Sequence, residues 1–309
     1  MGSSGSIAIL LATRNGAAFL DEQLVSLAAQ KAGVIDVWVS DDGSTDDTLA
    51  ILAAWKERWR RGRFEVLKGP EKGFSENFRS LVTNRAIEAD YYAFCDQDDI
   101  WDDDKLEKAT GWIEAQAKDM PLLYCSRTMN VSQSGVPIGA SPLFARRPSF
   151  RNALVQSIAG GNTMVMNRRA RSVLAEASER TGFVSHDWWA YQIVTGVGGV
   201  VKYCPEPSVR YRQHDGNQVG ANTSWRARHV RLKMLLRGQF SEWTAANLTS
   251  LGLCRDMLTP DARAALDLLA KVHGGKGLSR LYALKRSGAY RQTLVGNIML
   301  WVAAAAGWM

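Results

Sequence analysis

Short apolar runs alternate with segments of helical periodicity over the first hundred residues of the chain. In the segment 17–30, for example, Phe19, Leu20, Leu24 and Leu27 recur at helical spacing. Strands that alternate with helices predict an α/β fold with a mainly parallel sheet and right-handed crossovers. The strands are expected at 7–12, 34–40, 64–67 and 91–95, and the helices at 17–30, 46–59 and 74–87.

The pattern is less regular between about residue 118 and residue 225, and it is helical from there onward. Three prolines, Pro137, Pro142 and Pro148, mark a stretch that we interpret as loops. Beyond it, we expect strands at 161–166, 200–203 and 208–212 and helices that begin at residue 168 and at about residue 187. The sequence therefore predicts an α/β unit over 7–220 and a helical C-terminal region over 225–309.

Polar side chains follow the predicted strands at their carboxyl ends. In parallel sheets these ends meet at one edge, where the ligands of α/β proteins bind. We therefore expect one polar edge, which contains Thr13-Arg14-Asn15, Asp41-Asp42-Gly43-Ser44, Gly69-Pro70 and Asp96-Gln97-Asp98-Asp99.

The stretch 96–104 contains six carboxylates within nine residues. Asp96 and Asp98 follow a strand and can converge on one hard cation that prefers oxygen ligands. The alternative is that acids such as Asp99 and Asp102 only favour the N-terminus of the next helix. Stabilisation of the helix N-terminus explains the three aspartates at 102–104 better than it explains Asp96 and Asp98.

Three other stretches carry candidate chemistry, and each has a structural alternative. Asp42 can accept a hydrogen bond from a nucleobase, or its turn can be a simple Asx turn with a helix cap. Asp187 can be a general base, or a helix cap in front of two core tryptophans, Trp188 and Trp189. His214 can complete a metal site, although a lone histidine is more often structural.

Composition and charge narrow the class of protein. With 46% apolar and 22% charged residues, the 309-residue chain is globular, and its four isolated cysteines favour reduced thiols in a cytosolic protein over a disulfide framework or zinc site. The formal net charge of +7 is concentrated after Trp225, where 13 Lys and Arg face 4 Asp and Glu. No signature of a nucleic-acid-binding fold accompanies this charge, so an anionic membrane surface is the better candidate partner.

Seven ordered blocks over about residues 7–220 resemble the family-two glycosyltransferases with the GT-A fold, especially the rhamnosyltransferase branch of bacterial surface polysaccharide synthesis. The chain departs from the pattern at Arg14, where an aromatic residue is common, and at Asp215, which interrupts the usual Gln-His-Gly-Asn. The blocks are ILLATRNGAAFLDEQLVSLAAQ, VWVSDDGSTDDTLAIL, KGPEKGFSENF, YYAFCDQDDIWDDDKLEK, GGNTMVMNRRA, SHDWWAYQIV and RYRQHDGNQVG.

The resemblance implies a Rossmann-like GT-A domain that binds a nucleotide-sugar donor, either a dTDP-sugar or a UDP-sugar. Asp42 would accept the imide N–H of the pyrimidine. Asp96 and Asp98 would hold Mg²⁺ or Mn²⁺ on the diphosphate, with His214 as a further metal ligand and Asp96 also on the ribose. The other expected nucleotide-binding residues are Thr13, Asn15, Gly73 and Asn77.

The resemblance also implies an inverting mechanism with Asp187 as the catalytic base. The expected acceptor-binding residues are Asn162, Thr163, Trp188 and Trp189. The expected reaction moves a sugar, such as L-rhamnose from dTDP-rhamnose, to a hydroxyl of a surface-polysaccharide or lipid-linked glycan acceptor.

Two other functions remain open from the sequence. The first is a nucleotidyltransferase on a related α/β fold, although the chain lacks the Gly-rich, Lys-containing triphosphate loop near its start that such an enzyme would have. The second is a non-catalytic module that binds nucleotide sugars or glycans at the membrane. The apolar run 294–309 is too short for a confident spanning helix. It is either an interfacial helix at the cytoplasmic face of the inner membrane or a helix that packs on the catalytic core.

Overall fold

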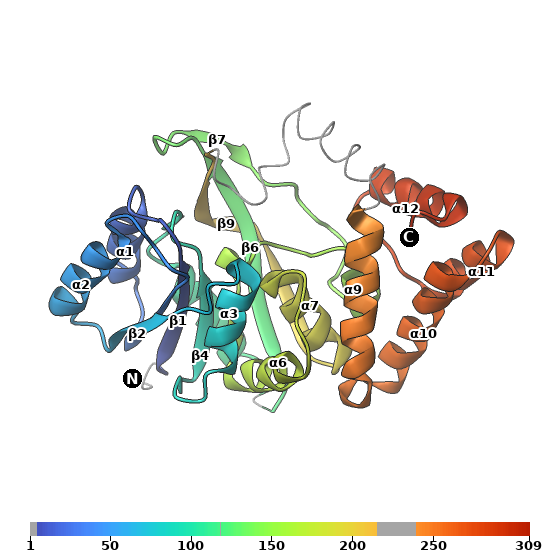
Figure 1. Cartoon of the computed structure of the whole chain (residues 1–309), viewed down its shortest axis with the longest axis horizontal. Helices are drawn as coiled ribbons and strands as arrows, with labels where there is room; N and C mark the ends of the chain where they lie inside the picture. Colours follow the sequence, from blue (N-terminus) through green and yellow to red (C-terminus); the bar gives the residue numbers. More distant parts are fainter. Residues whose placement is uncertain (1–4, 118, 215–238) are drawn as a thin grey trace.

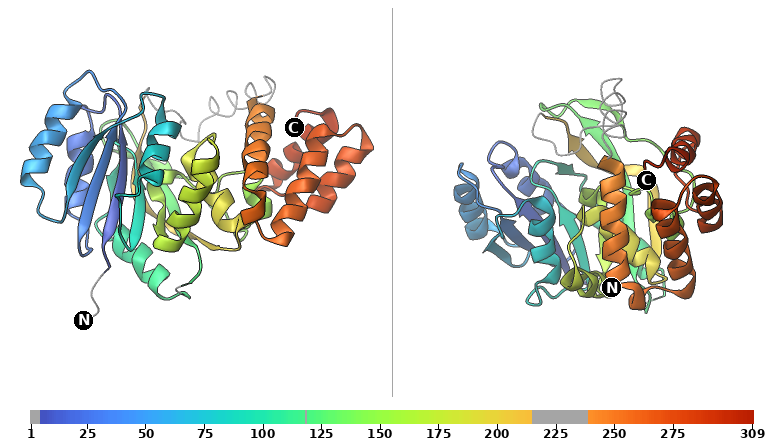
Figure 2. Two further views of the ribbon diagram at one scale, coloured as in Figure 1. Left: turned by 60° about the horizontal axis from the view of Figure 1, so that its bottom comes forward. Right: turned by 45° about the vertical axis from the view of Figure 1, so that its right-hand side comes forward.

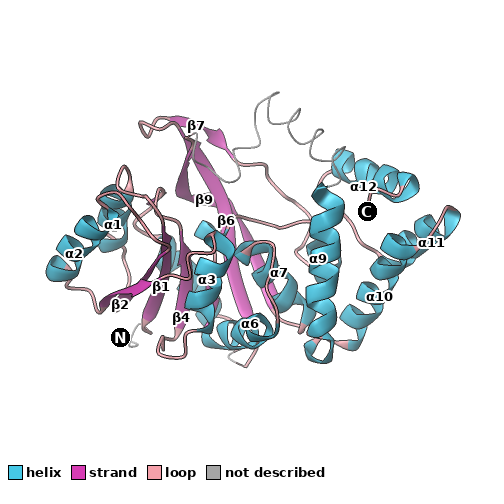
Figure 3. Ribbon diagram, viewed as in Figure 1, coloured by secondary structure: helices cyan, strands magenta, loops and turns pink. Residues whose placement is uncertain are grey.

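The computed structural model of the chain describes residues 5–117, 119–214 and 239–309. A twisted sheet runs through the body of the molecule with helices against both faces (Figures 1 and 3). The helices of the C-terminal region form one end of the molecule (Figure 2).

The strands of the described residues are β1 (Ile7–Thr13), β2 (Ile35–Asp41), β3 (Phe64–Lys68), β4 (Tyr91–Cys95), β5 (Ile100–Trp101), β6 (Leu122–Val131), β7 (Pro137–Ala140), β8 (Val165–Asn167) and β9 (Val200–Arg212). They form one sheet in the order β3-β2-β1-β4-β8-β6-β9-β5, with β7 paired to β6. The first four strands of this order are parallel, and β6 and β9 are also parallel. The short strand β8 is antiparallel to both of its neighbours, which makes the sheet mixed.

The helices are α1 (Leu20–Ala28), α2 (Thr48–Arg58), α3 (Phe74–Thr83), α4 (Lys105–Glu114), α5 (Phe150–Ala153), α6 (Arg168–Arg180), α7 (His186–Gly196), α9 (Gln239–Leu253), α10 (Pro260–Gly274), α11 (Leu278–Ser287) and α12 (Leu294–Ala306), with short 3-10 turns at Gly161–Thr163 and Arg255–Met257. Alternate residues of β1 point to opposite faces of the sheet. Ala8 and Leu10 pack in the cluster that contains α3, α6 and α7, whereas Ile7 and Ile9 pack against α1, α2 and α4. The two layers hold the strand ends of the central sheet in fixed positions.

The expected alternation of strands and helices in the first hundred residues is confirmed, with element ends shifted by at most four residues. The periodicity is reliable there because the parallel strands are buried and the helices each bury one face. The sheet and its flanking helices agree with the predicted α/β class.

The sequence prediction was wrong in three places between residues 118 and 212. No strand was expected at β6, which is buried on both faces and so shows no alternation of apolar and polar residues, and the proline-marked stretch interpreted as loops contains the strand β7. The strand expected at 161–166 is a 3-10 turn followed by β8. The two strands expected at 200–203 and 208–212 are one strand, β9, which continues through Pro205 and Pro207 with shifts in its register against β6.

The helices α9 to α12 do not have a core of their own. Leu251, Leu266, Leu284 and Leu300, one from each helix, belong to the same buried cluster as Trp189 of α7. The C-terminal helices therefore pack on the α/β layer. Among the described helices, none combines the length and the apolar character that crossing a bilayer requires.

Candidate active site

The carboxyl ends of β1, β2 and β4 bring the predicted polar residues to one edge of the sheet. Thr13 at the end of β1 lies opposite Asp41 at the end of β2, and its hydroxyl donates to the Asp41 carboxylate at 3.0 Å. The backbone N–H of Ser44 also donates to Asp41, at 2.9 Å. Asp41 thus stabilises its own turn, and the side chain of Thr13 is engaged in the same network.

Asp42 has a different environment from its neighbour. It is 1% exposed, and its Oδ2 accepts a hydrogen bond from the backbone N–H of Gly73 at 2.8 Å. In the described part of the chain, Oδ1 of Asp42 is buried with no hydrogen-bond partner. A buried acceptor without a partner carries a desolvation penalty, which a donor on a ligand can remove.

The predicted nucleotide-binding residues Asn15 and Asn77 lie beside Asp42 in the loop network. The Asn15 side chain accepts the backbone N–H of Thr45 at 2.8 Å, so it fixes the turn after β2. The Asn77 side chain donates to the Ser40 carbonyl at 2.9 Å, while its Oδ1 is buried without a partner among the described residues. Gly73 precedes α3 with a φ of +90°, a conformation that favours glycine. Asn77 and Asp42 therefore leave two acceptor oxygens free in the same loop network.

The carboxylates of Asp96, Asp98 and Asp187 lie close enough for their charges to interact where β4 ends and α7 begins. Burial, followed by the negative charges of Asp98 and Asp187, raises the pKa of Asp96 to about 8. The fold thus brings Asp187 to the acidic turn, although the two lie about ninety positions apart in the sequence. The three acids would share the site more easily if a cation lay among them.

Asp98 also contacts the predicted histidine. Its Oδ2 lies 2.8 Å from Nε2 of His214, and the His214 ring packs on Phe19 with a centroid separation of 5.0 Å. No three acidic, histidine or cysteine side chains of the described residues converge on a single metal position. The donors nevertheless fit a hard dication, because Asp96 and Asp98 supply oxygen and excess negative charge, and water or phosphate oxygens can complete the ligand set.

Asp99 is buried and does not cap the helix that follows. It accepts hydrogen bonds from the Asn162 side chain at 2.5 Å and from the backbone N–H of Arg212 at 3.3 Å. Burial, with the charges of Asp98 and Asp96, raises the pKa of Asp99 well above its usual range. The alternative in which Asp99 only stabilises the helix N-terminus is therefore wrong.

Lys105 lies in the interior near Asp99. Its ammonium group sits 3.4 Å from the centroid of the Trp101 ring and, among the described residues, has no hydrogen-bond partner. Burial lowers the pKa of Lys105 to about 7. A buried cation beside a buried acid offsets part of the negative charge beneath the turn.

Arg212 is a residue of the site that the sequence analysis did not identify. It is 2% exposed, and it donates to the Asp98 carbonyl at 3.1 Å and to the Glu22 carboxylate at 2.5 Å. These bonds join the acidic turn to α1 and β9. A single arginine at the end of a strand produces no pattern in the sequence. Only its position two residues before His214 could have indicated that it belongs to the site.

Gln97 connects the acidic turn to the loop after β1. Its side-chain amide accepts the backbone N–H of Arg14 at 2.8 Å and donates to the Arg14 carbonyl at 3.0 Å. Both contacts use the backbone of residue 14, which any residue type other than proline supplies. The departure from the family pattern at Arg14 therefore leaves this connection intact.

Asp187 lies half-buried in the first turn of α7. Its Oδ1 accepts the backbone N–H of Trp188 at 2.7 Å, and its Oδ2 lies 3.5 Å from the Ser157 hydroxyl. The preceding residue, His186, stacks on Phe78 at 3.7 Å between ring centroids. Burial lowers the pKa of His186 to about 4, so the imidazole is neutral at pH 7.

The other residues expected at the acceptor are in the interior. The indole N–H of Trp188 donates to the Ala153 carbonyl at 2.6 Å, and that of Trp189 donates to the Ser178 hydroxyl at 3.1 Å. Thr163 is buried and donates to the Gly160 carbonyl at 2.8 Å. These side chains pack as core residues, which is the structural alternative that the sequence left open. The Asn162 amide is engaged by Asp99, as described above.

Comparisons with known proteins identify the family of the chain and similar folds. Residues 8–170, just over half of the chain, match the family model described as glycosyl transferase family 2. A curated relative from Shigella flexneri, dTDP-rhamnosyl transferase RfbG, is 29% identical over 235 residues, which are 73% of this chain and 78% of the relative. A second relative, the uncharacterized protein Rv1520 of Mycobacterium tuberculosis, is 25% identical over 67% of this chain and 59% of its own length.

A solved structure supports the fold. The crystal structure of S. aureus TarS 1-349 in complex with UDP-GlcNAc superposes with a TM-score of 0.51. The alignment covers 92% of this chain and 89% of the TarS chain at 15% sequence identity, so the similarity concerns the fold alone.

We predict that His186 makes the folded state less stable in mild acid. The unfolded histidine takes up a proton near pH 6.5, whereas the buried one does so only near pH 4, so the free energy of unfolding falls as the pH drops between these values. The loss approaches about 3 kcal/mol. Denaturant titrations from pH 4 to pH 7 should show a flatter dependence for His186→Met.

The control for this prediction is Phe74→Met, which changes a ring that meets His186 edge-on at 6.4 Å between centroids but keeps the histidine. It should retain the wild-type dependence on pH. Equal slopes for wild type and His186→Met would contradict the assignment.

Proposed function

The chain belongs to glycosyl transferase family 2 and is a glycosyltransferase, and we propose that it moves L-rhamnose from dTDP-rhamnose to a hydroxyl of a surface-polysaccharide or lipid-linked glycan acceptor. The choice of donor is supported by the similarity to a dTDP-rhamnosyl transferase over 73% of the chain. We assign catalysis to the α/β unit over 7–220 and a supporting role to the helical region over 225–309, of which the structure describes 239–309.

The observation that carries the proposal is the electrostatic interaction of Asp96 with Asp98 and Asp187 at the carboxyl edge of the sheet. Burial, followed by the negative charges of Asp98 and Asp187, raises the pKa of Asp96 to about 8, which supports a site where the three acids act on one another. Such an arrangement costs stability in the empty protein. It becomes favourable when a ligand brings positive charge, as a metal-bound nucleotide diphosphate does.

Asp42 would recognise the base of the donor. Its buried, unpartnered Oδ1 can accept the imide N–H of thymine or uracil. Its Oδ2 is held by the backbone of Gly73, which fixes the orientation of the carboxylate. Adenine and cytosine lack a ring N–H that this oxygen could accept, so the site would favour thymine or uracil over these two bases.

Asp96, Asp98 and His214 would hold Mg²⁺ or Mn²⁺. When bound, the ion offsets the charge that develops on the departing diphosphate. Arg212 keeps the Asp98 backbone in place through the Asp98 carbonyl, so the turn is formed before the ion arrives.

Asp187 would act as the general base. In a single displacement, the acceptor oxygen forms its bond to the anomeric carbon while the bond to the diphosphate oxygen breaks, and the hydroxyl proton moves to the Asp187 carboxylate. Oδ1 is engaged by the backbone of its own helix, whereas Oδ2 has only the Ser157 hydroxyl at 3.5 Å. We therefore assign the proton to Oδ2. Attack from the face opposite the leaving group inverts the anomeric centre.

We predict that Asp187→Asn lowers kcat by about 10² to 10⁴, because an amide cannot take up the acceptor proton. The measurement is sugar transfer under saturating donor, with the thermal unfolding midpoint as a check of the fold. Asp47→Asn, at an exposed position before α2, is the matched control and should keep wild-type activity. Wild-type turnover by Asp187→Asn would remove the residue from the mechanism.

We predict that dTDP and UDP, each with Mn²⁺, stabilise the protein against thermal unfolding more than ADP does. At about 100 times the dissociation constant the stabilisation is about 2.7 kcal/mol. Asp42→Leu should lose the preference, since the imide acceptor is gone, while Asp47→Asn retains it. Equal stabilisation by ADP and dTDP would contradict the role of Asp42 without bearing on Asp187.

The C-terminal helices would attach the enzyme to the cytoplasmic face of the inner membrane. One face of α12 is exposed, with Leu294 at 77% and Val295 at 70%, and the same stripe continues through Ile298, Trp301 and Val302. After Asp267 the chain contains six Lys and Arg and no Asp or Glu. An apolar stripe in a segment that carries only positive charge after Asp267 fits the headgroup region of an anionic bilayer.

We predict that the protein floats with vesicles that contain phosphatidylglycerol at low salt. The double variant Ile298→Ser with Val302→Ser should bind at least about tenfold more weakly, because it removes two large apolar contacts with the bilayer. Val136→Ser with Ile138→Ser changes two exposed apolar residues at β7 and is the control. Absence of flotation by the wild type would leave α12 as a packing helix.

A further inference from the structure

Gly161 lies directly against the residue that precedes the proposed base. It begins the 3-10 turn Gly161–Thr163, and a Cβ added to it would lie 1.9 Å from Nε2 of His186, the first residue of α7. Real Cβ atoms do not approach another heavy atom this closely. Only glycine therefore lets the 3-10 turn and the start of α7 pack at this distance.

The His186 ring has no room to turn away from Gly161. One face of the ring stacks on Phe78 at 3.7 Å between centroids, and Phe94 meets the ring edge-on at 4.8 Å. Neither ring nitrogen has a hydrogen-bond partner among the residues that the structure describes, so packing alone sets the position of the ring. A larger residue at position 161 would therefore move the backbone on one side of the contact.

The 3-10 turn is anchored to the acidic turn and to the central sheet. The Asn162 side chain donates to the Asp99 carboxylate at 2.5 Å. The carbonyl of Met164, directly after the 3-10 turn, accepts the backbone N–H of Phe94 in β4 at 3.3 Å. These bonds connect the 3-10 turn to the strand that leads into the acidic residues 96–99.

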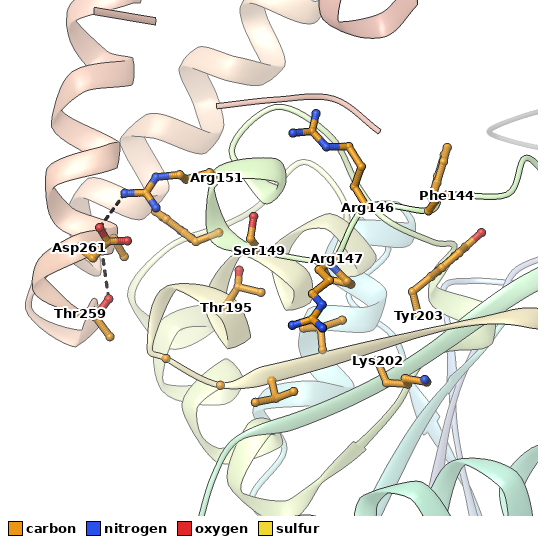
Figure 4. A pocket seen from close by; sticks show the side chains of 18 residues that line it. Phe144, Arg146, Arg147, Ser149, Arg151, Thr195, Lys202, Tyr203, Thr259 and Asp261 are labelled. Carbon is orange, nitrogen blue, oxygen red and sulfur yellow. Dashed lines mark hydrogen bonds and ion pairs between the residues drawn. The ribbon is translucent and has the colours of Figure 1, made fainter. Parts of the chain in front are cut away.

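The other end of α7 is closely packed as well. A Cβ added to Gly196, the last residue of the helix, would lie 2.7 Å from the Leu258 side chain. Beyond this end, α5 and α10 are joined by the ion pair of Arg151 with Asp261 at 2.7 Å, and Thr195 of α7 lines the same pocket (Figure 4). This packing opposes a shift of the whole helix, so pressure on its first residue would be absorbed in its first turn.

The segment 181–185, which leads into α7, is held less firmly than the 3-10 turn. Its residues are half-buried or exposed, and the side chain of Ser185 makes no capping hydrogen bond with any described residue. The 3-10 turn Gly161–Thr163, by contrast, is buried throughout. A methyl group added to the glycine would therefore displace the start of α7, and Asp187 would move with His186.

We propose that Gly161 and His186 are positioning residues that set the separation between the acidic turn and the Asp187 carboxylate. The inference rests on the proposed function, in which Asp187 takes the acceptor proton while Asp96 and Asp98 hold the donor side of the reaction. The contact acts on the base, because the 3-10 turn stays with the strand that carries the donor site. Neither Gly161 nor His186 is assigned a contact with substrate.

The test measures how fast the protein releases dTDP from dTDP-rhamnose with Mn²⁺, with water as the acceptor. The water oxygen bonds to the anomeric carbon as the bond to the diphosphate oxygen breaks, and the water proton goes to Asp187. Gly161→Ala should lower this rate by about 10², since a displacement of about 1 Å can have an effect of this size. Its affinity for dTDP with Mn²⁺, measured by calorimetry, should stay that of the wild type. His186→Ala should also lower the rate and keep the affinity, because the ring no longer fixes the start of α7.

The two changes combined show whether the residues act through their contact. In the His186→Ala background the added methyl group has room, so Gly161→Ala should lower the rate no further. Gly182→Ala, in the loop before α7, is the matched control, because among the described residues a Cβ there would approach only the Glu76 carboxylate, at 3.6 Å. It should release dTDP as fast as the wild type. A crystal structure of Gly161→Ala should show the first turn of α7 displaced and residues 160–163 in place.

The proposal is overturned if Gly161→Ala releases dTDP at the wild-type rate, if its loss is as large in the His186→Ala background, or if its affinity for dTDP falls as far as the rate. An unmoved Asp187 in the crystal structure would overturn it as well. Failure of the proposed function has a different signature, in which the wild type releases no dTDP or Asp187→Asn releases it at the wild-type rate. In that case the crystal structure alone decides whether Gly161 and His186 set the position of Asp187.

Discussion

Repulsion among Asp96, Asp98 and Asp187 is the constraint around which the polar edge of the sheet is organised. Burial is the main reason that the pKa of Asp96 is raised to about 8, and the negative charges of Asp98 and Asp187 add to the effect. The surrounding residues hold the turn in place, and Lys105 offsets part of its negative charge. Arg212 bonds to the Asp98 carbonyl and to the Glu22 carboxylate. A ligand that brings positive charge would relieve the repulsion that remains.

In each pair of adjacent acids, hydrogen bonds from the protein reach both carboxylate oxygens of one member, Asp41 or Asp99, whereas the other member, Asp42 or Asp98, has a contact at Oδ2. Asp41 accepts hydrogen bonds from Thr13 and Ser44 and stabilises its turn, whereas Asp42 keeps one oxygen unpartnered among the described residues. In the second pair, Asp99 is bonded to Asn162 and Arg212, whereas Asp98 faces His214. The structural acid fixes the backbone, and the neighbouring acid can then be held in an orientation that suits a ligand.

The sequence predicts the polar edge well because it depends on local features. Short buried strands, helical spacing and the residues that follow each strand are visible in a single sequence. Contacts that join distant loops are not visible, such as the bond of Gln97 to the backbone of residue 14 or that of Arg212 to the acidic turn. β6 was missed for a related reason, because a strand buried on both faces lacks the alternation that identifies a strand. The two tryptophans after Asp187 were ambiguous because core and sugar-stacking aromatics look alike in sequence.

The burial of these tryptophans explains how the proposed base is positioned. In α7 almost every side chain is buried, so the helix packs on all sides and has little freedom to shift or rotate. Trp188 and Trp189 are each fixed by an indole hydrogen bond, and the His186 ring is stacked on Phe78. Asp187 is the half-buried exception in this first turn, so its carboxylate is directed to the acidic edge by the packing of its neighbours. The tryptophans thus act on the site through the core of the protein.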